Sequence, residues 1–144
     1  YFQNVLPPDE NSNFLAAREN DNENELRGHR PSLFKDQYGD KDLTHILDDM
    51  ARDNFMKESY DFAKTLKESW KTNMGSRRVK IRQAPFYVVS TVNMPSLLVE
   101  VGYVTNAKEA KRLRSKRYQK RIAKTIYLAL KDYQKQQKKP VEQL

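Results

Sequence analysis

The chain has 144 residues but no cysteine, only two histidines and only four glycines. The absence of cysteine excludes thiol catalysis, disulfide bonds and thiolate zinc ligands together. The sequence also has no glycine-rich phosphate-binding loop and no Ser-His-Asp signature, which excludes the motifs of P-loop nucleotide-binding proteins and of serine hydrolases. No apolar run approaches the ~20 residues that a membrane-spanning helix needs, so no membrane span is predicted.

The residues that are present suffice for one domain with a core, since 38% are hydrophobic and 32% are charged. The net charge of +8 is placed unevenly, because residues 108–139, the basic zone, hold 13 basic and two acidic side chains. The basic zone is therefore net +11 and the remainder of the chain net −3. Such a zone attracts polyanions such as nucleic acid, anionic lipid or cell-wall polymer. The simpler alternative is the solvated face of a helix.

The first half of the chain is predicted to be mainly helical. Residues 11–20 favour a short helix that Asn11 or Ser12 caps, with an apolar side made of Phe14, Leu15 and Ala17. Residues 43–73 show apolar side chains at helical spacing. These apolar positions are Leu43, Ile46, Leu47, Met50, Phe62, Ala63, Leu66 and Trp70.

The ends and the middle of this second helical stretch also carry signals. Asp40 or Asp42 is the expected cap and Gly75 the expected stop. At Phe55 and Met56 the apolar stripe shifts to another face, which indicates a bend or a break. Residues 21–40 show no sustained period and are predicted to be an irregular connection.

Two strands are predicted next, at residues 86–91 and 96–104, because both runs are β-branched and aromatic. A helix over residues 105–115 follows, with Asn106 and Glu109 at capping-box spacing. The apolar stripe of a last helix consists of Tyr118, Ile122, Ile126, Leu130 and Tyr133. This order of elements predicts an α/β fold, with helices on both sides of a central, mostly parallel or mixed sheet.

One residue is out of place in the second predicted strand, where Glu100 interrupts a run of Leu and Val. A buried carboxylate without a partner is costly or becomes protonated. It therefore needs a cation such as Arg82, a metal ion, or an opening at the carboxyl end of the strand, where α/β proteins bind ligands. From these residues alone, a functional role and a structural ion pair are equally supported.

The other candidate site residues carry weaker signals. Arg82 and Gln83 precede the first predicted strand and suit the binding of an anionic substrate or the pairing of carboxylates. The H-x-x-D-D run from His45 to Asp49 has a metal-compatible spacing, but a surface histidine beside solvated aspartates is favoured. His29 stands between Arg27 and Arg30, which are poor neighbours for a cation. No metal ligand is predicted in this chain.

A longer ordered pattern runs from Ile81 to Tyr133, with the segments "RQA-F-VV", "MPSLLVE-GYVTN" and "A-RL-S" followed by "YQ", "IA" and "I". It resembles the C-terminal half of the zinc-dependent N-acetylmuramoyl-L-alanine amidases, the AmiC-like cell-wall hydrolases of the amidase 3 family. "YF…FLAAREN" resembles the preceding strand and helix, with Ala17, Glu19 and Asn20 in an A-x-E-N motif. "DLTHILDDM…S-DFAKTL" resembles the helical stretch between them, so nearly all of the chain is covered.

The resemblance implies a peptidoglycan hydrolase that cleaves the amide between N-acetylmuramic acid and L-alanine. In this family a zinc ion held by two histidines and a glutamate activates water, and a second glutamate transfers protons. By motif match the second glutamate is Glu100. The family's zinc ligands lie in its N-terminal half, and no motif here matches them. We therefore expect residues 1–139 to be the C-terminal part of one catalytic domain that lacks its N-terminal strands, and residues 140–144 to be a tail.

The resemblance also implies partners and a location. We expect the chain alone to bind no zinc and to hydrolyse nothing. Its partners would be peptidoglycan, the N-terminal segment of the same domain and an activator protein, but not nucleic acid. The location would be periplasmic or extracellular, in the bacterial cell envelope. The alternative function is a basic module that binds a polyanion or the cell wall without catalysis.

Overall fold

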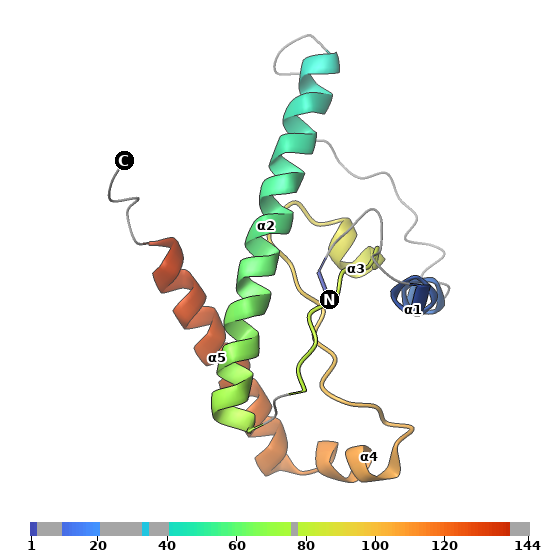
Figure 1. Cartoon of the computed structure of the whole chain (residues 1–144), viewed down its shortest axis with the longest axis vertical. Helices are drawn as coiled ribbons and strands as arrows, with labels where there is room; N and C mark the ends of the chain where they lie inside the picture. The colour runs from blue at the N-terminus through green and yellow to red at the C-terminus, as the bar shows by residue number, and fades with distance from the viewer. Residues whose placement is uncertain (3–9, 21–32, 35–40, 76–77, 139–144) are drawn as a thin grey trace. The chain divides into compact units, whose positions relative to one another are not determined.

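The computed structural model describes residues 1–2, 10–20, 33–34, 41–75 and 78–138. Helices make up about 70% of these described residues. They are α1 (Glu10–Asn20), α2 (Lys41–Met74), α3 (Tyr87–Ser90), α4 (Ala107–Leu113) and α5 (Lys116–Gln137), as Figure 1 shows. The chain divides into two compact units, unit 1 (Tyr1–Tyr60 with Arg82–Leu98) and unit 2 (Asp61–Ile81 with Val99–Leu144). No described helix is both long and apolar enough to cross a membrane.

The predicted central sheet is wrong for the described residues, which contain no strand ladder. Their β-pairing is a single parallel bridge between Phe2 and Gln83. The Phe2 N–H donates to the Arg82 carbonyl oxygen over 3.1 Å, and the Leu98 N–H donates to the Tyr1 carbonyl oxygen over 2.8 Å. The extended chain at residues 82–84 thus pairs only with Phe2, and the extended chain at Leu98 pairs only with Tyr1. A strand needs several paired residues in succession, so a bridge forms instead of a sheet.

The first predicted strand, residues 86–91, is instead the site of α3. Its first helical N–H, that of Tyr87, donates to Oδ1 of Asn20 over 3.0 Å. Near its other end, the Ser96 hydroxyl donates to the Val89 carbonyl oxygen over 3.1 Å. These two side chains satisfy helix-end groups that would otherwise lack partners. Partners outside the segment therefore favour a helical turn over the strand that local propensity predicts.

The core of unit 1 confirms the first predicted helix, but of its predicted apolar side only Leu15 packs against the core. The buried side chains of α1 are the small ones of Ser12 and Ala16, whereas Phe14 is 69% exposed. Asn11 and Ser12, the predicted caps, lie inside the helix. Ala16 packs with Ala84, Phe86 and Val89, against which Tyr1, Leu15 and Leu98 lie. The small side chain of Ala16 lets the helix approach Phe86 closely.

The second predicted helix forms as one continuous helix, α2, so the break predicted at Phe55 and Met56 is wrong (Figure 1). It begins at Lys41, so Asp42 lies in its first turn, while Asp40 is outside the described residues. The predicted stop is confirmed, because Gly75 has φ +70° and its N–H donates to the Lys71 carbonyl oxygen over 3.2 Å. That left-handed conformation suits glycine and ends a helix.

The apolar stripe of α2 is buried over only half of the helix. In unit 2, Ala63 and Leu66 are buried as predicted, whereas in unit 1 Met50 is 65% exposed. The predicted core positions Leu43 and Ile46 are exposed as well. Helical periodicity therefore located the helix correctly, but it did not show which turns find a packing partner.

Unit 2 joins the second half of α2 to α5. The Phe62 and Tyr133 rings pack with centroids 5.0 Å apart, and the Ser69 hydroxyl donates to the Thr125 carbonyl oxygen over 3.1 Å. The buried stripe of α5 is Ile122, Thr125, Ala129 and Tyr133, while the predicted core residue Leu130 is 40% exposed. Thr125 and Ala129 take its place because their small side chains allow close approach between the two helices.

Candidate functional site

Glu100 lies in unit 2, in the extended stretch between α3 and α4. Its side chain is exposed, and its Oε2 accepts a hydrogen bond from the Tyr103 hydroxyl over 3.3 Å. The predicted position inside a central buried strand is therefore wrong. An exposed carboxylate carries little desolvation cost, so its presence requires neither a metal ion nor a buried cation. What the structure does show is an accessible carboxylate with one phenolic contact.

The turn that follows Glu100 is held by Glu109, in the first turn of α4. The Tyr103 N–H donates to Oε2 of Glu109 over 2.8 Å. Gly102 has φ +151°, and a Cβ built there would lie 3.0 Å from the same Glu109 oxygen and 3.4 Å from Cδ1 of Leu113. A residue with a side chain would thus be strained and crowded at this position. Glu109 orients the backbone of Tyr103, and the Tyr103 hydroxyl in turn contacts Glu100.

The predicted capping box at the start of α4 is confirmed in one half. The Asn106 side chain accepts from the N–H groups of Lys108 and Glu109, over 3.1 Å and 3.3 Å. The Glu109 carboxylate accepts a hydrogen bond from the Tyr103 N–H, and it thereby connects the start of α4 to the residue that contacts Glu100. Sequence reasoning identified Asn106 and Glu109 as a cap but missed their connection to Glu100 through Tyr103. The available signal was the Gly-Tyr pair two residues after the glutamate.

Arg82 and Gln83, the predicted substrate-binding residues, lie in unit 1, where Gln83 forms the bridge with Phe2 and Arg82 directly precedes it. Both are half-buried, and the backbone carbonyl of Arg82 is bound to Phe2. Their role toward a substrate stays a prediction. Because Glu100 belongs to unit 2, the predicted pairing of Arg82 with Glu100 also stays a prediction.

The described residues do not fit a zinc ion. Within residues 1–2, 10–20, 33–34, 41–75 and 78–138, no group of three His, Cys, Asp or Glu side chains could hold a metal. His45 is exposed. Asp48, predicted to be solvated, is only 7% exposed, and its Oδ1 accepts from the Leu33 N–H over 2.8 Å. His29 lies outside the described residues. A catalytic zinc needs three protein ligands, and these side chains do not supply them.

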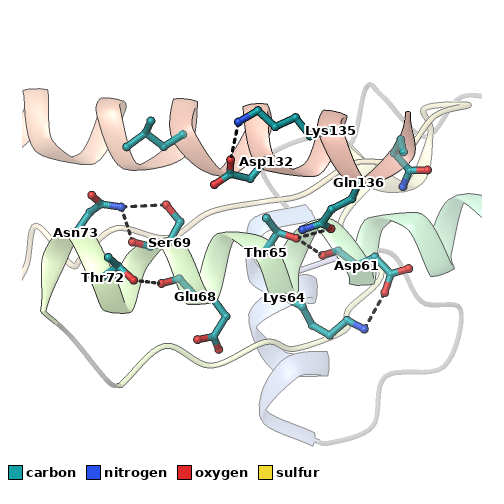
Figure 2. A pocket seen from close by; sticks show the side chains of 12 residues that line it. Asp61, Lys64, Thr65, Glu68, Ser69, Thr72, Asn73, Asp132, Lys135 and Gln136 are labelled. Atoms are coloured by element: carbon teal, nitrogen blue, oxygen red, sulfur yellow. Dashed lines mark hydrogen bonds and ion pairs between the residues drawn. The ribbon is translucent and has the colours of Figure 1, made fainter. Parts of the chain in front are cut away.

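Unit 2 also contains a groove of about 990 Å³ between the second half of α2 and α5, shown in Figure 2. Its polar side chains mostly bond within their own helices. The Thr72 hydroxyl donates to the Glu68 carbonyl oxygen over 3.1 Å, and the Asn73 amide donates to the Ser69 carbonyl oxygen over 2.8 Å. Lys135 and Asp132 form an exposed ion pair of 3.6 Å. The groove therefore carries charges of both signs, and most of its described polar groups already form hydrogen bonds with one another. We interpret it as a polar contact between two helices and not as a catalytic site.

Comparison with known proteins places these features in a family. A family model described as N-acetylmuramoyl-L-alanine amidase matches residues 15–132. The chain is 33% identical over 102 residues to a putative N-acetylmuramoyl-L-alanine amidase of Buchnera aphidicola subsp. Acyrthosiphon pisum, covering 71% of this chain and 43% of that protein. It is 26% identical over 95 residues to the amidase AmiC of Escherichia coli O6:H1, covering 66% of this chain and 23% of AmiC.

A third relative, the amidase LytC of Bacillus subtilis, is 38% identical over 55 residues, which is 38% of this chain and 11% of LytC. No solved structure matches the chain. The chain spans less than half the length of each of these relatives. The family model nevertheless matches most of the chain, and it confirms the resemblance predicted from the segments that begin at "FLAAREN" and "RQAPF". The chain therefore belongs to the N-acetylmuramoyl-L-alanine amidase family.

Proposed function

We propose that this chain forms part of a peptidoglycan hydrolase that cleaves the amide between N-acetylmuramic acid and L-alanine. The match of residues 15–132 to the amidase family supports this proposal, together with the names of the relatives. The place of action would be the bacterial cell envelope, in the periplasm or outside the cell, where peptidoglycan lies. The N-terminal segment of the domain and an activator protein are the further partners proposed.

Within this reaction we assign Glu100 the role of general acid and base. The observation that carries the assignment is an exposed carboxylate, in the family's V-E-x-G motif, whose Oε2 is bound to Tyr103. No described residue hydrogen-bonds to the other oxygen, Oε1. That oxygen can take a proton from the water that attacks the amide carbonyl and deliver it to the departing amine. The Glu109 contact to Tyr103 would keep the carboxylate in one orientation.

The zinc ion that the family implies is not assigned to the described residues, because they do not form its ligand set. We therefore expect the 144-residue chain alone to release no stem peptides from purified peptidoglycan. Chromatography of the soluble products measures this release directly. Stem-peptide release by the chain alone, abolished by a chelator, would contradict the expectation.

The variant Glu100→Gln tests the assignment in an active preparation of the polypeptide that contains this chain. Glutamine keeps the size and the hydrogen-bond acceptor for Tyr103 but cannot take up a proton at neutral pH. We expect kcat to fall by about 10²–10⁴-fold, the usual contribution of general acid–base catalysis. Zinc content, measured by atomic emission, should not change. Glu68→Gln, an exposed glutamate of the same unit, is the matched control and should retain full activity.

The alternative function is a cell-wall-binding module without catalysis. It is favoured by the exposure of all 12 basic side chains between Lys108 and Lys138.

Full turnover in Glu100→Gln, or a loss of zinc in step with a loss of turnover, would remove the proposed role of Glu100. Absence of hydrolysis by every preparation that contains the zinc ligands would leave the binding module as the better account.

A further inference from the structure

A second hollow in unit 2, of about 450 Å³, is lined only by cationic side chains. This cationic hollow is lined by Lys116, Arg117, Lys120, Arg121 and Lys124. All five lie in the first half of α5 and are exposed. No acidic residue occurs between Glu109 and Asp132 in the sequence, so positive charge is not balanced along this helix.

The stability of α5 does not explain this arrangement. The first turn of the helix contains Lys116 and Arg117 and no acidic residue, although the helix dipole favours negative charge there. Like charges four residues apart, as at Lys116 and Lys120, repel each other on a helix surface. None of the five side chains forms an ion pair with a described residue. The cations therefore weaken the helix slightly, and a bound anion would remove that repulsion.

One member of the cationic hollow is already held in place. The Arg121 Nη2 donates to the carbonyl oxygen of Asn73, at the end of α2, over 2.6 Å. An arginine has five N–H donors, so this contact leaves others for a ligand. Fixing the guanidinium in advance lowers the conformational entropy that a ligand contact would otherwise lose.

The chemistry of the hollow selects the kind of anion. Lysine and arginine are donors without acceptors, so the ligand should present acceptor oxygens. Lys116, Lys120 and Lys124 recur every four residues, which is ~6 Å along a helix axis, so the anionic groups should recur as well. The hollow has no aromatic side chain on which nucleic-acid bases could stack and no apolar side chain to enter a membrane.

We propose that the cationic hollow binds a linear phosphodiester polymer that carries no bases. Its phosphate oxygens would accept hydrogen bonds from successive lysines, and Arg117 and Arg121 would bind them in bidentate fashion. Binding of this kind involves no bond cleavage, so the proposal does not depend on the amidase activity. In a cell envelope it would hold the protein on an anionic polymer beside the peptidoglycan.

The test measures binding of the chain to fluorescently labelled poly(glycerol phosphate) by anisotropy, over salt concentrations from about 50 to about 200 mM. The test variant is the triple substitution Lys116→Gln, Lys120→Gln and Lys124→Gln. Its matched control is Lys108→Gln, Lys111→Gln and Lys131→Gln, which removes the same charge from α4 and α5 outside the hollow. Glutamine has nearly the helix propensity of lysine, so both triples should keep the circular dichroism of the parent.

We expect the hollow triple to lose at least ~10-fold in affinity at the lower salt concentration. The slope of log K against log salt should become shallower by about 2, since each contact to a single strand contributes ~0.7. The control triple should lose less than ~3-fold. If the hollow triple loses helix content, the single variant Lys120→Gln replaces it, with an expected slope change of ~0.7.

Three outcomes would overturn the proposal. Equal losses in the two triples would mean that diffuse charge, and not the hollow, attracts the polymer. Tighter binding of a single-stranded DNA of equal charge would identify a nucleic-acid surface. Binding of phosphatidylglycerol vesicles without binding of the polymer would identify a membrane surface.

Discussion

Asn20, the last residue of α1, connects two elements of unit 1 through its side-chain amide. Its Nδ2 donates to the Pro85 carbonyl oxygen over 2.9 Å, and its Oδ1 accepts from the Tyr87 N–H over 3.0 Å. The second bond caps the start of α3. Replacing Asn20 with alanine removes both bonds and leaves two backbone groups without these partners. We therefore predict that Asn20→Ala destabilises unit 1 more than its half-buried position alone indicates.

The size of the effect follows from the two hydrogen bonds. Each contributes about 0.5–1.5 kcal/mol net, so the free energy of unfolding should fall by about 1–3 kcal/mol. Loss of a helix N-cap alone costs about 0.5–2 kcal/mol, which agrees with that range. For a domain of this length 1 kcal/mol corresponds to a change in Tm on the order of 4 °C, so a decrease of roughly 4–12 °C is expected.

Urea denaturation followed by far-UV circular dichroism measures the change, with the m value as a check on two-state behaviour. Asn54→Ala is the matched control, because its amide makes one exposed bond, of 3.0 Å, to Glu58 within α2. Alanine also has the better helix propensity, so the control should change stability by less than about 0.5 kcal/mol. Equal stabilities of Asn20→Ala and Asn54→Ala would refute the reasoning that Asn20 caps α3.

Three further changes test other parts of the structure by the same denaturation assay. Gly102→Ala should cost about 1–3 kcal/mol, because φ +151° and the Glu109 oxygen at 3.0 Å oppose a side chain; unchanged stability would contradict this. Ser69→Ala should cost about 1 kcal/mol by removing the bond to the Thr125 carbonyl oxygen, whereas the exposed Thr72→Ala should cost less. Phe86→Ala should cost about 3–5 kcal/mol, because the ring is 1% exposed and packs on Tyr1 at 5.0 Å; a loss below 1 kcal/mol would show that Phe86 is not a core residue.

Sequence periodicity predicted the helices well where the pattern was long. The stretch ending at Gly75 and the last helix both form, since a run of many turns sums weak preferences into a strong signal. Short apolar runs were the failure, as residues 86–91 show. Their β-branched side chains fit a strand, but Asn20 and Ser96 supply the hydrogen bonds of a helical turn. No local pattern contains those partners.

The candidate site was likewise predicted correctly only in part. The V-E-x-G motif and its flanking residues pointed to the amidase family and to Glu100, and the family is confirmed while the role stays a prediction. The surroundings expected for Glu100 were wrong, because the run of Leu and Val suggested a buried strand where the chain is extended and Glu100 is exposed. The Gly-Tyr pair after the glutamate signals a turn, but the hydrogen bonds that link Glu109 through Tyr103 to Glu100 are visible only in the structure.

The sequence by itself determined the family, the positions of the long helices, the helix stop at Gly75 and the concentration of positive charge near the C-terminus. These properties depend on residue types and spacings along the chain, so they are visible without coordinates. Only the tertiary structure decided which side chains are buried and that residues 86–91 are helical. Each of those outcomes depends on contacts between residues far apart in sequence, whose free energies exceed the local preferences of the segments involved.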